Sequence, residues 1–145
     1  MDFFSAMRIS ASGLTAQRTR MNVTASNLAN VDTTAPNGEL GYKRRSPVMS
    51  AVPLSQAFGE VLGDQIHEQT HTVEVSEIAE LDVERLEYQP DHPHADEQGY
   101  VHKPDISVIQ EMVNMVTSSR GYEANVTAIQ TIKNMANQAL TIGER

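Results

Sequence analysis

The chain has 145 residues, a net charge of −8 and no cysteine or tryptophan. This length suits one domain or one elongated subunit, the acidic balance argues against nucleic acid as a ligand, and the missing cysteines exclude disulfides and thiol chemistry. Aromatic residues make up 5% of the chain, so we expect a thin core that a partner completes.

The N-terminal segment predicts a helix over residues 3–29. Apolar side chains recur at alternating steps of three and four, the heptad-like pattern of one helix face. This stripe holds Phe4, Met7, Ala11, Leu14, Met21, Ala25 and Leu28, with Arg18 interrupting it. Asp2 is the expected N-cap, and the pattern ends in the turn formers of "NVDTTAPNGELG". Such a helix would be about 40 Å long.

The middle of the chain has a different texture. "GYKRRSPVMSAV" predicts a strand interrupted by Pro47, and the alternation over residues 71–89 predicts two short strands or a hairpin. "QAFGEVLGDQI" fits either a loop or one helical turn. "QPDHPHADEQGYVHKPD" is rich in proline and predicts an ordered turn region.

The C-terminal segment predicts a second helix over residues 107–141. Ser107 and Gln110 form a capping-box start, and Gly143 is a plausible stop. At 1.5 Å per residue this helix would be about 50 Å long. Its stripe holds Val108, Met112, Met115, Tyr122, Val126, Ile129, Ala136 and Leu140, with Ser119 and Lys133 interrupting it.

The expected fold is mainly α, with a coiled-coil-like stalk of two long terminal helices and a small β-rich insert between them. We divide the chain into 1–34, 35–106 and 107–145. Further apolar residues lie beside the stripes and predict a second packing partner, which we take to be another subunit. They are Ile9, Val23, Ile109, Val113, Val116 and Ile132.

Seven asparagines lie on these two helical segments, although asparagine is a poor helix former. A buried, bonded amide in a helix seam fixes register, whereas an exposed one is simply solvated. We interpret the set as register devices, with solvation as the alternative for each one. The set is Asn22, Asn27, Asn30, Asn114, Asn125, Asn134 and Asn137.

Both ends carry a family resemblance. "ISASGLTAQRTRMNVTASNLANVDTT" and "MVTSSRGYEANVTAIQTIKNMANQAL" resemble the terminal signatures of the flagellar rod, hook and hook-associated proteins. The insertion "TAPNGEL" before Gly41 and the run over 88–106 are similar to the proximal rod branch of that family. Asp32 and the pair Asp105-Ile106 depart slightly from its pattern, and residues 46–80 carry no such signal.

The resemblance implies a non-enzymatic structural subunit of the bacterial flagellar basal body, without cofactor, nucleic acid or small-molecule substrate. Such a subunit leaves through the flagellar type III export apparatus without a cleaved signal peptide. It polymerises through its terminal helices, with copies of itself, other proximal and distal rod proteins and the basal-body base protein. The product is the rod, an axial shaft that crosses the periplasm and transmits motor torque.

On this interpretation two sets of residues are expected to matter. The assembly interface is expected at Leu14, Met21, Asn22, Asn27, Leu28, Asn30, Met112, Met115, Tyr122, Asn125, Ile129, Asn137 and Leu140. An ordered middle motif is expected at Pro90, His92, Pro93, Gly99, Tyr100 and Pro104.

Two alternatives remain. "HEQTH", residues 67–71, has the letters of a zinc-peptidase motif, in which two histidines one helical turn apart bind the metal. Its flanks predict a loop that leads into a strand, which makes a chance match the better interpretation. The second alternative is a free-standing coiled-coil adaptor that forms a closed dimer.

Overall fold

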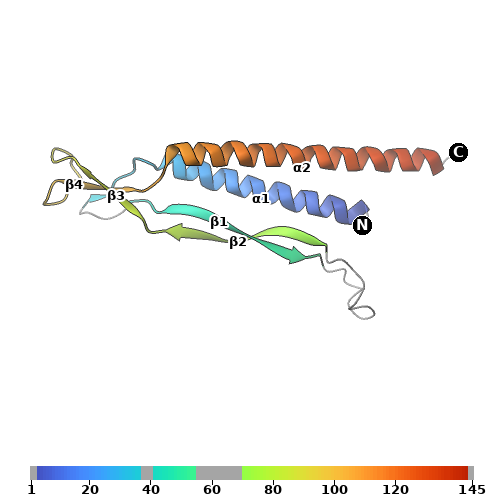
Figure 1. Ribbon diagram of the computed structural model, residues 1–145, viewed down its shortest axis with the longest axis horizontal. Coiled ribbons are helices and arrows are strands. Elements are labelled where there is room, and N and C mark those ends of the chain that lie inside the picture. The colour runs from blue at the N-terminus through green and yellow to red at the C-terminus, as the bar shows by residue number, and fades with distance from the viewer. Residues whose placement is uncertain (1–2, 37–40, 55–69, 144–145) are drawn as a thin grey trace.

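The computed structural model describes residues 3–36, 41–54 and 70–143 of the chain. The molecule is elongated, with two helices side by side, one antiparallel ribbon along their flank and a shorter ribbon that extends beyond one end of the helix pair (Figure 1). The elements are α1 (Phe3–Ala29), β1 (Arg44–Pro53), β2 (His71–Leu81), β3 (Glu84–Tyr88), β4 (Tyr100–Pro104) and α2 (Val108–Gly143). Two terminal helices with a small β insert between them are therefore confirmed.

The two helices are antiparallel. Gly13 lies against the Asn125 side chain, and Gly121 lies against the Gln17 side chain, so each step forward in α1 is matched by an equal step backward in α2. The chain leaves α1, builds the β insert and returns at the same end, which brings both termini to the opposite end of the molecule (Figure 1). Because α2 is 36 residues long and α1 only 27, α2 extends past the start of α1.

The predicted stripes are only partly covered in the structure, with Leu14, Tyr122 and Ile129 among their half-buried members. Ala16 and Asn27 of α1 and Ser118 of α2 are buried, whereas the stripe residues Phe4 and Met112 are exposed. Small and polar side chains outside the predicted stripes therefore also contribute to the contact between the helices. A Cβ added at Gly13 would lie only 2.9 Å from Asn125 Oδ1. At this position the small size of the side chain, rather than its hydropathy, allows the two helices to pack closely.

The longer ribbon pairs β1 with β2 in antiparallel register, with an irregularity between Val48 and Met49. Pro47 pairs opposite Ile78 within a continuous strand, so the predicted interruption at this proline was wrong. Each strand of a two-stranded ribbon has one edge without a partner strand. Proline has no backbone N–H, and at such an edge its absence costs no hydrogen bond between the strands. The ribbon lies beside α1 (Figure 1).

The shorter ribbon pairs β3 with β4. Residues 71–89 do contain two strands, β2 and β3, but each pairs with a strand from elsewhere rather than with the other. Strand β4 lies inside the proline-rich run for which only turns were predicted. The expected N-cap Asp2 and the ambiguous segment 56–66 lie outside the described residues.

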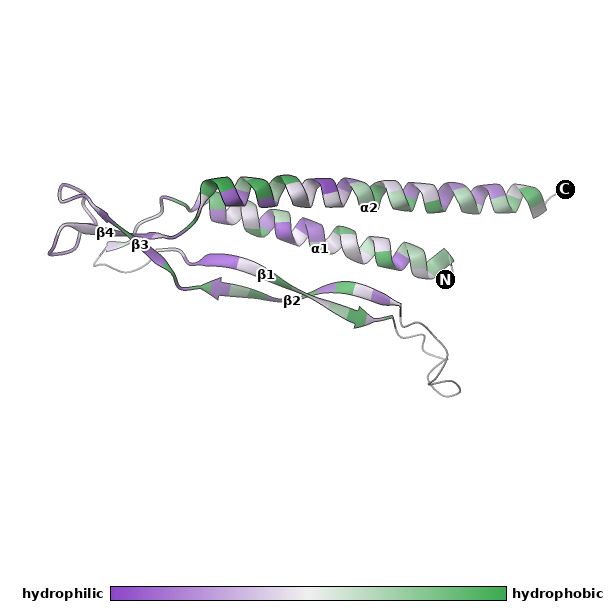
Figure 2. Cartoon of the chain, in the orientation of Figure 1, coloured by the Kyte–Doolittle hydropathy of each residue, from purple (hydrophilic) through white to green (hydrophobic). Residues whose placement is uncertain are grey.

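The apolar core is small, as the composition predicts. Its buried members among the described residues are Ala16, Val23, Val101 and Ile106. Much of the apolar surface lies outside, most visibly at the start of α2 (Figure 2). Neither helix has a stretch long and apolar enough to span a membrane.

Candidate assembly interface and its internal frame

Asn27, near the end of α1, is only 1% exposed, and its side chain forms hydrogen bonds with Arg45, Tyr42 and Glu111. Its Nδ2 donates to the Arg45 carbonyl at 2.8 Å, and its Oδ1 accepts from the Arg45 N–H at 2.9 Å. The Tyr42 hydroxyl donates to the same Oδ1 at 2.9 Å. The amide thus binds the first residues of β1 much as a neighbouring strand would.

Glu111, in the first turn of α2, closes this cluster and is 2% exposed. Its Oε1 accepts from Arg44 Nη2 at 2.7 Å and from Arg44 Nε at 3.1 Å. Its Oε2 accepts from Asn27 Nδ2 at 3.3 Å. We call these residues the Asn27 junction: Asn27, Tyr42, Arg44, Arg45 and Glu111. It joins the end of α1, the start of β1 and the start of α2.

Arg44 and Glu111 were not predicted from the sequence as functional residues. Acidic residues are common in the first turn of a helix, because they interact favourably with the helix dipole, so Glu111 does not stand out in the sequence. Its partner Arg44 is 67 residues away in the chain. A single sequence offers no indication of such a pairing.

Two other predicted asparagines bond within their own helices. The side-chain amide of Asn30, just after the end of α1, donates to the Ser26 carbonyl at 2.8 Å, and the Asn30 backbone N–H donates to the same carbonyl at 3.2 Å. The Asn125 amide donates to the Gly121 carbonyl at 2.8 Å, with its side chain against Gly13. These two amides shape the helix pair from within one chain.

The remaining predicted interface residues divide by exposure. Asn22, Met112, Asn137 and Leu140 are exposed, and their side chains are available to a neighbour. The half-buried residues are Leu14, Met21, Leu28, Met115, Tyr122 and Ile129. Ser107 caps the start of α2 as predicted, because its Oγ accepts from the Gln110 N–H at 3.4 Å, whereas the Gln110 side chain donates to Asn114 Oδ1 at 3.3 Å.

The middle motif is an ordered turn between β3 and β4. Gly99 has a φ of +84°, a conformation that favours glycine, and an added Cβ would lie 3.0 Å from the Tyr88 ring. Asp96 Oδ1 accepts from the Tyr100 N–H at 2.8 Å and from the Gln98 N–H at 2.9 Å. The Tyr100 N–H, ahead of the Gln98 N–H, lowers the pKa of the Asp96 carboxyl group. Asp96 organises this turn, and the sequence did not single it out.

The other predicted motif residues surround this turn. Pro104 is buried at the end of β4, His92 is half-buried, and Pro90 and Pro93 are exposed. Tyr88 and Tyr100 stack edge to face with ring centroids 5.3 Å apart.

Polar contacts hold the middle motif to neighbouring segments. His94 Nδ1 and Thr34 Oγ1 lie 2.9 Å apart, which links the turn to the segment after α1. Lys103 Nζ lies 2.8 Å from Glu87 Oε2 and 3.6 Å from Asp32 Oδ1. The Lys103 ammonium lowers the pKa of Glu87, and Glu87 in turn raises the pKa of Lys103.

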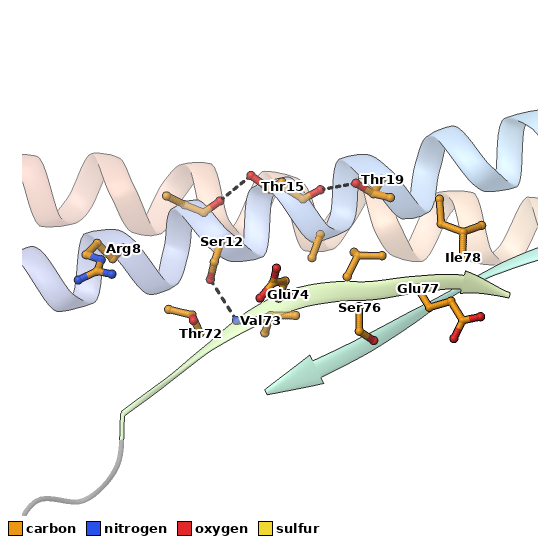
Figure 3. Close-up of a pocket in the computed structure, with 13 residues that line it drawn as sticks. Arg8, Ser12, Thr15, Thr19, Thr72, Val73, Glu74, Ser76, Glu77 and Ile78 are labelled. Atoms are coloured by element: carbon orange, nitrogen blue, oxygen red, sulfur yellow. Dashed lines mark hydrogen bonds between the residues drawn. The ribbon is translucent and has the colours of Figure 1, made fainter. Parts of the chain in front are cut away.

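A groove of about 850 Å³ runs between α1 and β2 (Figure 3). The Val73 N–H donates to Ser12 Oγ at 3.2 Å across it, and the Thr15 and Thr19 hydroxyls bond back to carbonyls of their own helix. Small and hydroxyl side chains therefore line the helix side of this groove. The Thr15 and Thr19 hydroxyls are thus engaged by the backbone of α1.

The zinc-peptidase alternative finds no support in the part of the chain that the structure describes. His71 is the first residue of strand β2 and is exposed, whereas His67 and Glu68 lie outside the described residues. Among the described residues, no three acidic or histidine side chains gather closely enough to hold a metal ion.

Comparison with known proteins places both ends of the chain in one group. Residues 7–36 match the family model described as flagella basal body rod protein. Residues 97–142 match the model described as flagellar basal body rod FlgEFG protein C-terminal. The matches cover most of α1 and α2 and define the class: the chain is a structural protein of the flagellar basal-body rod.

Curated relatives give the family. The chain is 43% identical to the flagellar basal-body rod protein FlgC of Bacillus subtilis, over 99% of this chain and 100% of that protein. It is 44% identical to FlgC of Aquifex aeolicus, over 92% and 91%, and 37% identical to FlgC of Escherichia coli, over 99% and 100%. The chain belongs to the FlgC family of flagellar basal-body rod proteins. The prediction of a structural rod subunit rather than an enzyme is thereby confirmed.

Proposed function

We propose that the chain polymerises through its terminal helices into the proximal part of the flagellar rod. The rod is the axial shaft that crosses the periplasm and transmits motor torque. The partners we propose are further copies of the chain, other proximal and distal rod proteins and the basal-body base protein. Export proceeds through the flagellar type III apparatus without cleavage of a signal peptide.

One observation carries this proposal: large apolar side chains lie uncovered along the helices. Ile109 is 77% exposed and Leu140 is 69% exposed, although both lie on ordered helix. A subunit with so small a core and so much uncovered apolar surface is completed by neighbours. The coiled-coil-like stalk that the heptad stripes predict is then a property of the assembled rod, in which these stripes meet other subunits.

Genetic and biochemical tests on a flagellated host distinguish this proposal from a dispensable accessory role. Deleting the gene should abolish swimming, and purified basal bodies from the complemented strain should contain the chain. Mass spectrometry of those basal bodies should detect the peptides of residues 2–12, as expected for uncleaved export. Basal bodies with intact rods in the deletion strain would contradict the proposal.

A further inference from the structure

The ribbon of β3 and β4 has one covered face and one uncovered face. Directly paired residues of an antiparallel ribbon point to the same side, so Tyr88 and its partner Tyr100 share a face with Leu86. Tyr88 is 64% exposed, and Leu86 and Tyr100 are exposed as well. On the opposite face Val101 is fully buried and the Lys103 side chain is mostly covered. We call the uncovered side the tyrosine face: Leu86, Tyr88 and Tyr100.

The surroundings of the tyrosine face are acidic. Residues 83–105 contain six acidic and only two basic residues. The two bases, Arg85 and Lys103, are paired with each other on the opposite face of the ribbon. Asp91 and Glu97, in the turn between the two strands, are exposed and form no ion pair among the described residues. Exposed aromatic rings beside acidic groups of this kind suit a cationic partner.

The same chain already binds a guanidinium in such a setting. The Arg45 guanidinium lies 5.7 Å from the centroid of the Tyr42 ring, and its Nη2 lies 3.0 Å from Glu80 Oε1. An arginine can stack on an aromatic ring and pair with a carboxylate at once, because its guanidinium is planar and always charged. The tyrosine face has the rings and the neighbouring acids but no arginine of its own.

Helix α1 carries the complementary charge. It contains Arg8, Arg18 and Arg20 and no acidic residue. Arg8 lines the groove beside β2, and the Arg20 side chain contacts Met49 of β1, so both lie next to the longer ribbon of their own chain. Arg18 is exposed and forms no ion pair with any residue that the structure describes. Arg18 is therefore the arginine of α1 that is open to another molecule.

One subunit keeps these two features apart. Arg18 lies about 16 Å before the end of α1 at 1.5 Å per residue, whereas β3 and β4 extend beyond that end of the helix pair (Figure 1). A contact between Arg18 and the tyrosine face therefore joins two copies of the chain.

We infer that the tyrosine face of one copy receives Arg18 of a second copy, with the guanidinium over the Tyr88 ring. This inference rests on the proposed polymerisation and adds a contact between the β insert of one subunit and α1 of its neighbour. Two different surfaces meet, so the contact is heterologous and can repeat from copy to copy in an open polymer. Pairing of one tyrosine face with another is disfavoured, because it brings two acidic surfaces together.

Engineered cysteines beside the contact test it, since the chain has no cysteine of its own. Gln98→Cys and Asn22→Cys are combined in one chain. Both side chains are exposed, Gln98 lies two residues from Tyr100, and Asn22 lies one helical turn from Arg18. The double variant replaces the native chain, and isolated basal bodies are treated with a short bismaleimide. We expect cross-linked bands of two or more copies from the double variant and none from either single variant.

The matched control combines Gln98→Cys with Gln138→Cys. Gln138 is also exposed on a helix but lies near the far end of α2. This pair should give no cross-linked band, because the inferred contact places the turn of one copy beside the middle of α1 in the next.

Further substitutions in the cross-linking chain test the chemistry of the contact. Tyr88→Phe keeps the ring and should keep the band, whereas Tyr88→Leu and Arg18→Leu should each remove most of it. The two leucine changes together should reduce the band no further than either one alone, because both remove the same contact. Arg120→Leu changes an exposed arginine on α2 and should leave the band unchanged.

Basal bodies that contain the double variant without a cross-linked band would overturn the inference. So would an unchanged band after Arg18→Leu, or cross-linking of Gln98→Cys alone to a second copy, which indicates like-to-like pairing. Cross-linking of Gln98→Cys to a different rod protein would assign the tyrosine face to that protein and contradict the inference as well. Absence of the native chain from basal bodies would instead contradict the proposed function itself.

Discussion

Asn27 and Glu111 are 84 residues apart in the sequence, and the Asn27 amide donates a hydrogen bond to the Glu111 carboxylate at 3.3 Å. The same amide binds both backbone groups of Arg45. Because every hydrogen-bonding position of Asn27 is used inside one chain, this asparagine sets the register of the subunit itself. The expectation from the sequence was that it acts mainly between subunits.

Replacing Asn27 by leucine should therefore destabilise the isolated subunit. The change leaves the Arg45 backbone and the Tyr42 hydroxyl without their buried partner, at a cost of about 3 kcal/mol in the free energy of unfolding. Urea unfolding followed by circular dichroism measures this loss. Asn22→Leu is the matched control, because Asn22 is exposed on the same helix and leucine is the better helix former. Equal stability of the two variants would contradict this role for Asn27.

The neighbouring arginines should differ sharply in their effect. Arg44→Met leaves the buried carboxylate of Glu111 without its cation, which costs about 3 kcal/mol. Arg45→Met removes an ion pair with Glu80 in which both side chains are about half exposed, and such pairs contribute about 0–1 kcal/mol. Thermal unfolding of the two variants compares them. A larger loss for Arg45→Met would show that the buried Arg44–Glu111 ion pair is not a main source of the subunit's stability.

Substitution of Gly99 should disturb the middle motif through its backbone. Gly99→Val forces a β-branched residue into a φ of +84° and places a Cβ 3.0 Å from the Tyr88 ring, with a backbone cost of about 1–2 kcal/mol. Gly99→Asn should lose less, because asparagine tolerates this conformation better. Swimming and rod yield measure the effect in cells. Wild-type motility of Gly99→Val would mean that the motif is only a spacer.

Acid should loosen the same turn. The folded-state pKa of Asp96 is lowered below its ordinary value of 3.8, so the stability it contributes is present above about pH 4 and is lost as the pH falls through the folded pKa. A smaller protection factor of the Tyr100 amide in acid, after correction for the slower intrinsic exchange at low pH, reports this loss. Asp96→Asn keeps an acceptor oxygen without a titrating group, so its exchange should lose this extra acid dependence. The same acid response in both proteins would assign the effect to another group.

The sequence predicted elements well where local chemistry determines them. The first helix has the expected bounds, Ser107 caps α2, and Gly99 occupies a position that requires positive φ. Each of these features depends on residues that are close in the chain. For such features, the hydrophobic pattern and the residues typical of caps and turns are sufficient to predict the structure.

Long-range features were not predictable in the same way. The helix seam includes Gly13, Gln17 and Gly121, which carry no hydrophobic pattern, while the apolar stripes that such patterns reveal are only partly covered. Strand β4 was hidden in a proline-rich run because its partner β3 supplies the pairing. Asp96 and Glu111 resemble ordinary surface acids until the groups that bind them are known.

A density map of the intact basal body, at a resolution that shows side chains, tests the central claim most directly. The account predicts this chain in the proximal rod as an antiparallel α1–α2 pair, with Ile109 and Leu140 covered by neighbouring subunits. A map in which the chain lies outside the rod, or in which these two side chains face solvent in the assembled rod, would contradict it.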